Sequence, residues 1–293
     1  MKAVKEIANA KINLYLDVIA RREDGFHDIK TVMHSVSLHD ELTVVYKPSN
    51  TTNIRLRLRG NRFLPTDDKN LAARAAALYL ETLKRTADIE ITLKKKIPIA
   101  AGLAGGSSDA AATLRAMNRL FDKAFTERAL YNMASTLGSD VPYCLYGKTA
   151  LCEGRGEILT KLPDTLKLNV VVAVANEHVS TPRAYTALDD MYSSFDGSVS
   201  TGGEEFYDSF IDLLTHGKPL TCELFNVFEK AVFKTCPGAL KIKKRLTELG
   251  ADTTLMSGSG PSVFGVFESE KKARAACEAL RAKKIIAYFA KSV

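Results

Sequence analysis

The sequence predicts an α+β protein in which strands and helices are interleaved, and three observations support this fold class. Segments with alternating apolar and polar residues, a pattern typical of half-buried strands, occur at 12–16, 54–59 and 89–93. An alanine- and leucine-rich segment at 71–83 has the composition of a helix. A continuous valine-rich run at 168–175 predicts a buried strand.

Along the N-terminal half, residue spacing predicts each element in turn. Ile12, Leu14 and Leu16 alternate with polar or smaller residues, so we expect a strand with one buried face. In segment 54–59, arginines alternate with apolar residues, which predicts a strand with one face in water. A later helix has apolar residues on one face at helical spacing: Ala110, Ala111, Leu114, Met117 and Leu120.

Polar and glycine residues mark the ends of elements farther along the chain. Thr126 is a suitable N-cap and Gly138 a suitable stop, so a helix is expected at 127–137. The polar, glycine-containing segment 193–205 predicts a long surface loop. Helices are expected after it, at 223–235 and 239–249.

Composition excludes several classes of protein. Of 293 residues, 46% are hydrophobic and 26% charged, which argues against a disordered or fibrous chain. The net charge of +7 suits an anionic metabolite or nucleic acid without choosing between them, and the lysine run 94–96 is expected to be solvated surface. The five cysteines include no CxxC pair, and no apolar run reaches membrane-spanning length. We therefore expect a cytoplasmic protein without a disulfide framework or structural metal.

The segment that is most informative about function is a loop of small residues between a predicted strand and a predicted helix. Small residues let backbone N–H groups approach an anion closely, and a helix N-terminus adds unpaired N–H groups and a positive dipole. This combination suits a triphosphate, although the sequence has neither a Walker GK[ST] ending nor GxGxxG. A glycine-rich turn before a capped helix is the structural alternative. The loop comprises Pro98, Ile99, Ala100, Ala101, Gly102, Leu103, Ala104, Gly105, Gly106, Ser107 and Ser108.

Four blocks, in order along the chain, resemble motifs of the GHMP kinase superfamily. The loop sequence PIAAGLAGGSSDAAA resembles the PxxxGLxxSSxxxxA phosphate loop of these kinases. AKINL at 10–14 and DGFH at 24–27 resemble the AKINLxL…DGYH signature of its diphosphocytidyl-methylerythritol kinases. LGSDVP at 137–142 and MSGSGPS at 256–262 resemble two further blocks. Asn9 and Phe26 depart from the usual proline and tyrosine.

The resemblance implies a fold and an activity. It implies a two-lobed GHMP-kinase fold with the active site in the cleft between the lobes, divided into residues 1–152 and 153–293. It also implies a kinase that uses ATP with Mg²⁺ to phosphorylate the 2-hydroxyl of 4-diphosphocytidyl-2-C-methyl-D-erythritol, in the non-mevalonate isoprenoid pathway. We expect no nucleic-acid or membrane partner, and a monomer or weak homodimer.

The resemblance also implies which residues carry the chemistry. Phosphoryl transfer to an alcohol requires a bound triphosphate, a carboxylate that orients or deprotonates the hydroxyl, and cations against the developing charge. Asp140 is the implied carboxylate and Lys11 the implied cation, although alone they equally suit a turn residue and a surface lysine. Either Gly105 or Gly106 is a candidate for a positive φ in the phosphate loop.

The substrate residues implied by the resemblance lie at both ends of the N-terminal signature and in the second half of the chain. Asn13 follows Lys11 on the same strand face and could hydrogen-bond the substrate. Phe26 and His27 are implied at the cytidine, with Tyr185 facing them. Two aromatic rings can sandwich a base of any identity, so His27 is expected to distinguish cytosine by hydrogen bonds to its edge.

Three alternatives stay open. Another GHMP kinase would phosphorylate homoserine, a mevalonate derivative or a sugar. A nucleic-acid-binding α+β module would carry basic residues interleaved with exposed aromatics, a pattern that the sequence lacks. A GHMP-like protein without catalysis would have no need of Lys11, Asp140 and an intact loop.

Overall fold

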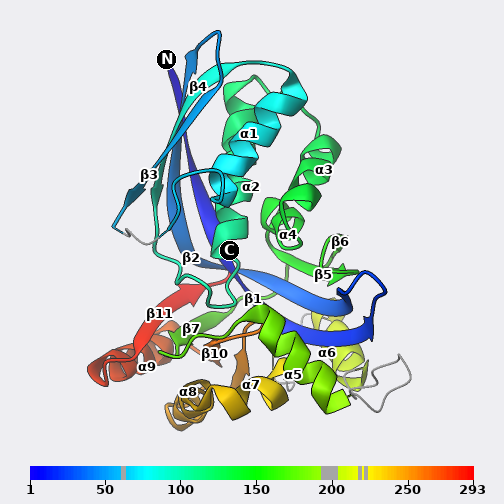
Figure 1. The fold of residues 1–293 in the computed structure, drawn as a ribbon. Coiled ribbons are helices and arrows are strands. Elements are labelled where there is room, and N and C mark those ends of the chain that lie inside the picture. The colour runs from blue at the N-terminus through cyan, green and yellow to red at the C-terminus, as the bar shows by residue number, and fades with distance from the viewer. Residues whose placement is uncertain (61–63, 193–203, 217–219, 221–223) are drawn as a thin grey trace. The chain divides into compact units, whose positions relative to one another are not determined.

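The computed structural model describes residues 1–60, 64–192, 204–216, 220 and 224–293, and it confirms the α+β class (Figure 1). Its internal contacts divide the chain into two units: residues 1–10, 39–99 and 104–146 form the first, and residues 11–38, 100–103 and 147–293 the second. Strands β1 (Lys2–Arg21) and β2 (His27–Pro48) contribute to both units. The division of the lobes at residue 152 was made along the sequence and stays a prediction.

The first unit is a sheet with helices packed on one face (Figure 1). Its strand order is β3-β4-β2-β1, with β3 (Asn53–Arg59) parallel to β4 (Ala87–Lys94) and β2 antiparallel to β4. Alternate apolar residues of the strands pack against the helices, while the arginines of β3 are exposed, as predicted. The helices are α1 (Leu71–Leu83), α2 (Gly105–Leu120), α3 (Glu127–Leu137) and α4 (Val141–Tyr146).

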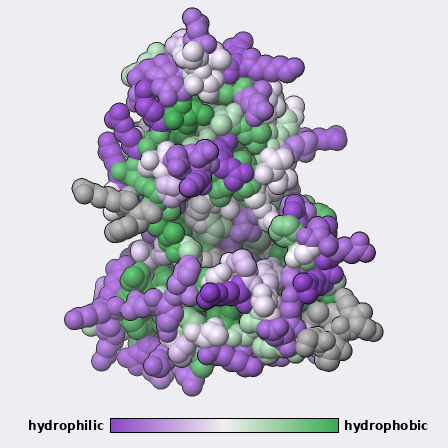
Figure 2. Space-filling view, in the orientation of Figure 1, coloured by the Kyte–Doolittle hydropathy of each residue, from purple (hydrophilic) through white to green (hydrophobic). Residues whose placement is uncertain are grey.

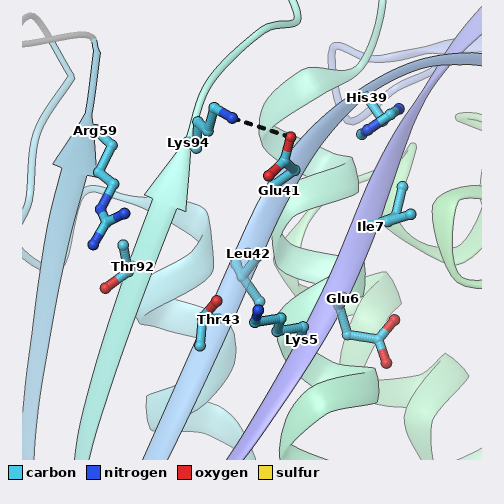
Figure 3. Close-up of a pocket in the computed structure, with 10 residues that line it drawn as sticks. All are labelled: Lys5, Glu6, Ile7, His39, Glu41, Leu42, Thr43, Arg59, Thr92 and Lys94. Carbon is cyan, nitrogen blue, oxygen red and sulfur yellow. Dashed lines mark hydrogen bonds and ion pairs between the residues drawn. The ribbon is translucent and has the colours of Figure 1, made fainter.

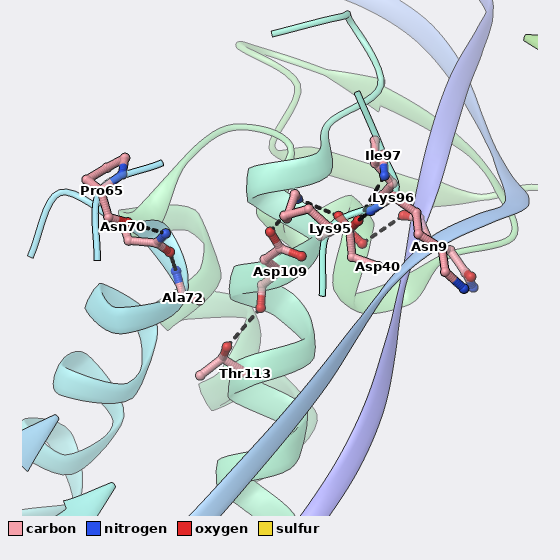
Figure 4. Close-up of polar contacts among 11 residues, drawn as sticks. Asn9, Asp40, Pro65, Asn70, Ala72, Lys95, Lys96, Ile97, Asp109 and Thr113 are labelled. Carbon is pink, nitrogen blue, oxygen red and sulfur yellow. Dashed lines mark hydrogen bonds and ion pairs between the residues drawn. The ribbon is translucent and has the colours of Figure 1, made fainter. Parts of the chain in front are cut away.

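Side chains at the helix ends explain where two of these helices begin. Asn70 accepts a hydrogen bond from the Ala72 amide at 3.0 Å and donates one to the Pro65 carbonyl at 2.9 Å (Figure 4). The predicted cap of α3 is confirmed, because the Thr126 hydroxyl accepts from the Ala129 amide and Gly138 follows the last helical residue.

The second unit contains an antiparallel sheet in the order β11-β7-β10-β9. Its strands are β7 (Asn169–Val174), β9 (Thr253–Met256), β10 (Ser262–Phe267) and β11 (Ile286–Lys291). Apolar residues of this sheet form one core with helices α5 (Thr181–Tyr192), α7 (Phe228–Thr235), α8 (Pro237–Glu248) and α9 (Glu270–Ala282). The unit also includes α6 (Glu204–His216), β5 (Thr149–Glu153), β6 (Ile158–Lys161) and β8 (Phe225–Asn226).

Three predicted elements differ from the structure or fall partly outside it. Strand β1 is buried on both faces from Ala10 to Val18, so the half-buried prediction is wrong. Leu16 and Val18 pack in the core of the second unit, and the neighbouring Tyr15 contacts Tyr207 of α6. The helix predicted at 223–235 begins only at Phe228, because Phe225–Asn226 pair with Tyr15 and Leu16 of β1 as strand β8. Of the loop predicted at 193–205, residues 193–203 lie outside the described residues, and α6 begins at Glu204.

The surface of the protein is mainly hydrophilic on the face shown in Figure 2. Smaller hydrophobic areas lie among the hydrophilic residues. Within the described part of the chain, no helix is long and apolar enough to cross a bilayer.

A buried histidine joins β2 to the C-terminal residues within the second unit. The two ring nitrogens of His34 lie 2.9 Å from the hydroxyls of Thr149 and Ser292. Ser292 in turn accepts a hydrogen bond from the Leu168 amide at 2.7 Å. Burial lowers the pKa of His34 to about 4, so the ring is neutral in the folded protein at neutral pH.

We predict that His34 makes the protein less stable in mild acid. Between pH 6.5 and 4 the unfolded chain binds a proton at this histidine and the folded chain does not, so the free energy of unfolding falls as pH falls. From pH 7 to 4.5, wild type should lose about 2 kcal/mol more than His34→Gln in urea titrations. The control is His216→Gln, whose side chain is exposed. Parallel pH profiles of wild type and His34→Gln would contradict this role.

Candidate functional site

The second unit brings Lys11 and Asn13 to the middle of the phosphate-loop sequence. The Lys11 side chain is buried, and its Nζ donates to Asn13 Oδ1 at 2.6 Å and to the Gly102 carbonyl at 2.8 Å. The Lys11 amide donates to the Leu103 carbonyl at 3.2 Å. Asn13 donates to the Thr31 hydroxyl at 2.8 Å, which fixes its amide. The predicted cation is therefore held in one place by neutral oxygens, beside residues 102–103.

The glycine–serine turn at 257–262 contacts the same part of the loop. Ser257 Oγ donates to the Gly102 carbonyl at 2.9 Å. Asn226 holds the turn, because its amide donates to the carbonyls of Met256 at 2.7 Å and Gly258 at 2.9 Å. The sequence identified the loop and the turn but missed Asn226. Its signal is a buried asparagine between apolar residues, two positions before the first residue of α7.

Positive φ angles in the phosphate loop fall at residues other than those predicted. Gly102 has φ +75° and Ala100 and Ala104 also have positive values, whereas Gly105 and Gly106 do not. Gly105 and Gly106 form the first turn of α2, which requires right-handed helical dihedrals. The expectation of a positive φ at one of these two glycines is therefore wrong.

The remainder of the loop belongs to the first unit and leads into α2. The cap residue Ala104 makes no side-chain hydrogen bond to the helix. Ser108 is buried and its hydroxyl donates to the Asn9 carbonyl at 2.7 Å, so this hydroxyl fastens α2 to β1. Gly106 is exposed and Ser107 half-buried, which leaves them as the accessible part of the helix start.

A buried ionic cluster fixes the strand from which the loop departs (Figure 4). Lys95 Nζ contacts Asp40 and donates to Asp109 Oδ2 at 2.6 Å. Asp40 also accepts from the Lys96 amide and, at 2.9 Å, from the Ile97 amide. Its carboxylate therefore holds three consecutive residues, 95–97, immediately before the loop.

The burial of Lys95 in this cluster corrects the expectation of a solvated lysine run, and Asp109 in the same cluster has a raised pKa. The side chain of Lys95 is 4% exposed, because it enters the space between β2 and α2, so the run 94–96 is not uniformly solvated. Burial raises the pKa of Asp109 to about 7, against the ammonium of Lys95, and Asp40 adds to the shift. The second oxygen of Asp109 has no hydrogen-bond partner among the described residues.

Asp140 lies in the first unit, directly before α4. It is half-buried, and its carbonyl accepts from the Cys144 amide at 3.0 Å. Lys11 belongs to the second unit, so the two predicted catalytic residues lie in different units, and their shared role stays a prediction.

The residues predicted to contact the base, Phe26, His27 and Tyr185, all belong to the second unit, and two of them, His27 and Tyr185, contact each other. The ring of Tyr185 stacks on His27 with centroids 4.6 Å apart and meets Phe228 edge-on at 4.8 Å. Phe26 is 52% exposed, and the guanidinium carbon of Arg155 lies 5.0 Å from its ring centroid. The sandwich of a base between Phe26 and Tyr185 stays a prediction.

A separate groove of about 670 Å³ opens on the first unit's sheet (Figure 3). Residues of β1, β2, β3 and β4 contribute to it, and none of the predicted site residues lines it. The residues around it are Lys5, Glu6, Ile7, His39, Glu41, Leu42, Thr43, Arg59, Thr92 and Lys94. Across the described ranges, no group of three or more His, Cys, Asp or Glu side chains could hold a metal ion.

Similar proteins agree with this arrangement of motifs. Residues 70–148 match the family model described as GHMP kinases N terminal domain, and residues 207–286 match GHMP kinases C terminal. The 4-diphosphocytidyl-2-C-methyl-D-erythritol kinase of Macrococcus caseolyticus is 38% identical over 280 residues, 95% of each chain.

Two solved structures have a fold similar to that of this chain. The crystal structure of a 4-(cytidine 5'-diphospho)-2C-methyl-D-erythritol kinase is 34% identical, covers 98% of both chains and superposes with a TM-score of 0.80. A homoserine kinase from Cytophaga hutchinsonii covers 100% of this chain and 95% of its own, with a TM-score of 0.73 at 22% identity. At that identity the second likeness concerns the fold alone.

We predict that Gly102→Ala is more damaging than loss of a positive-φ glycine elsewhere. An added Cβ would lie 2.1 Å from the Ser257 carbonyl oxygen, so the loop or the turn must move. Gly250→Ala is the matched control, because Gly250 has φ +85° and open space around its added Cβ. Gly102→Ala should lose about 1–3 kcal/mol more unfolding free energy in denaturant titrations. Equal losses in the two variants would contradict the close approach.

Proposed function

Because the chain belongs to the GHMP kinase family, among relatives named 4-diphosphocytidyl-2-C-methyl-D-erythritol kinase, we propose that it phosphorylates the 2-hydroxyl of that diphosphocytidyl polyol with ATP. The observation that carries the proposal is identity of 38–41% to these relatives over nearly the whole chain. The second unit supports this proposal at two places. It holds Lys11 of the AKIN block against the Gly102 carbonyl, and it stacks His27 of the DGFH block on Tyr185. The products are ADP and the 2-phosphate.

The phosphate loop supports binding of the triphosphate. Gly106 and Ser107 are the accessible residues at the start of α2, where backbone N–H groups and the helix dipole favour an anion. Mg²⁺, when bound with ATP, supplies positive charge to the phosphate oxygens. The Ser107 hydroxyl, at the accessible start of α2, is an oxygen ligand of the kind that this ion prefers and would help to hold it.

Lys11 and Asp140 have complementary roles in the proposed transfer. The Asp140 carboxylate accepts the proton of the substrate hydroxyl or orients it toward the γ-phosphorus. The Lys11 ammonium stabilises negative charge that develops on the transferred group, and its fixed position lowers the reorganisation that this requires.

The cytidine end of the substrate is the basis for selecting one acceptor over another. Phe26 presents an exposed ring, Tyr185 a second ring, and His27 a polar edge. Homoserine and mevalonate carry no base, so this aromatic group favours the diphosphocytidyl acceptor. ADP release should therefore require that substrate; release with homoserine or phosphomevalonate instead would refute the assignment.

We predict that Asp140→Asn loses ~10²–10⁴ of kcat and keeps its affinity for ATP. The amide has the same shape but neither the charge nor the basicity. Lys11→Ala should also lower kcat. The control is Asp122→Asn, because the Asp122 side chain is exposed and forms an ion pair with Lys2. A near-normal kcat in Asp140→Asn would assign the residue to structure.

We predict that Phe26→Ala and Tyr185→Ala each raise KM for the diphosphocytidyl substrate. Stacking of a base on an aromatic ring contributes ~1–3 kcal/mol, which corresponds to a rise of roughly fivefold to a hundredfold. The KM for ATP is the internal control and should not change. If both constants rise together, the aromatic rings support the fold rather than the base.

A further inference from the structure

His27 is held on two sides by one helix of the second unit. Tyr185 and Asp189 are four residues apart on α5, so their side chains lie on the same helix face. The Tyr185 ring covers the face of the imidazole, and Asp189 Oδ1 lies 2.8 Å from His27 Nε2. The histidine side chain is 7% exposed, so few other orientations are open to it.

The contact with Asp189 decides which ring nitrogen carries the proton. An ionised carboxylate can only accept hydrogen bonds, so His27 Nε2 must be the donor. The guanidinium of Arg21 lies 3.8 Å from the other oxygen of Asp189, so both oxygens of this carboxylate face a partner. In the neutral ring, Nδ1 is then left as an acceptor, because the hydrogen bond at one nitrogen sets the state of the other.

We propose that Asp189 is a positioning residue that holds His27 as the Nε2–H tautomer and thereby makes the site selective for cytosine over uracil. This inference rests on the proposed function. Cytosine has an amino donor at position 4, which a Nδ1 acceptor can bind. Uracil has a carbonyl acceptor there, which the same nitrogen repels.

The first test compares Asp189→Asn and Asp189→Ala with wild type. The side-chain amide that Asp189→Asn introduces can either accept from Nε2–H or donate to Nε2, and Asp189→Ala offers Nε2 neither, so both variants leave both tautomers open. The ratio of kcat/KM for 4-diphosphocytidyl-2-C-methyl-D-erythritol to that for its uridine counterpart should fall about tenfold or more in both variants. The matched control is Asp190→Asn, at the neighbouring carboxylate, which should keep the wild-type ratio.

A second test does not depend on turnover. The ¹⁵N shifts of His27 in the ligand-free protein should indicate the Nε2–H tautomer in wild type and Asp190→Asn, and a mixture of the two tautomers in both Asp189 variants. An unchanged tautomer, or an unchanged substrate ratio in an active enzyme, would overturn the positioning role. If wild type does not phosphorylate the cytidine substrate at all, the proposed function fails, and the ¹⁵N shifts still decide whether Asp189 positions His27.

Discussion

The close approach of Gly102 to the turn at 257–258 is the constraint on which the site of the second unit depends. One carbonyl oxygen, that of Gly102, accepts hydrogen bonds from both Lys11 and Ser257. The approach leaves no space for a side chain, and it occurs at a positive φ that favours glycine. Three segments far apart in the sequence are therefore fixed by one peptide group, and the orientation of Lys11 follows from it.

A different kind of interaction fixes the part of the loop that belongs to the first unit. Asp40, Lys95 and Asp109 are buried together, and the cluster joins β2, the end of β4 and the first turns of α2. Burial of such charges costs free energy that their mutual contacts offset, so the cluster contributes geometry more than net stability. Burial raises the pKa of Asp109, and the second carboxyl, that of Asp40, raises it further, while the shared Lys95 opposes both effects.

The same fold accommodates kinases with different acceptors, as the likeness to a homoserine kinase indicates. In the proposed function the phosphate loop binds ATP, the donor that these kinases share, so it would not distinguish their acceptors. Discrimination must come from side chains elsewhere, and in this chain the aromatic and polar group of Phe26, His27, Tyr185 and Asp189 has the chemistry of a base-binding site. That role is part of the proposed function; what the structure supplies is the stacking of Tyr185 on His27 and the contact of Asp189 with its Nε2.

The sequence by itself determined the α+β class, several of the helices and strands, and the family, because periodicity, caps and ordered motifs are local properties. It predicted α1 and the Thr126 cap correctly but placed a helix across β8, where pairing with β1 overrides helical spacing. It could not find Asn226, Asp189 or the burial of Lys95, because each acts through partners that the chain brings near only on folding. Only the tertiary structure decided which glycine of the loop takes the positive φ, since that depends on the backbone at Ser257.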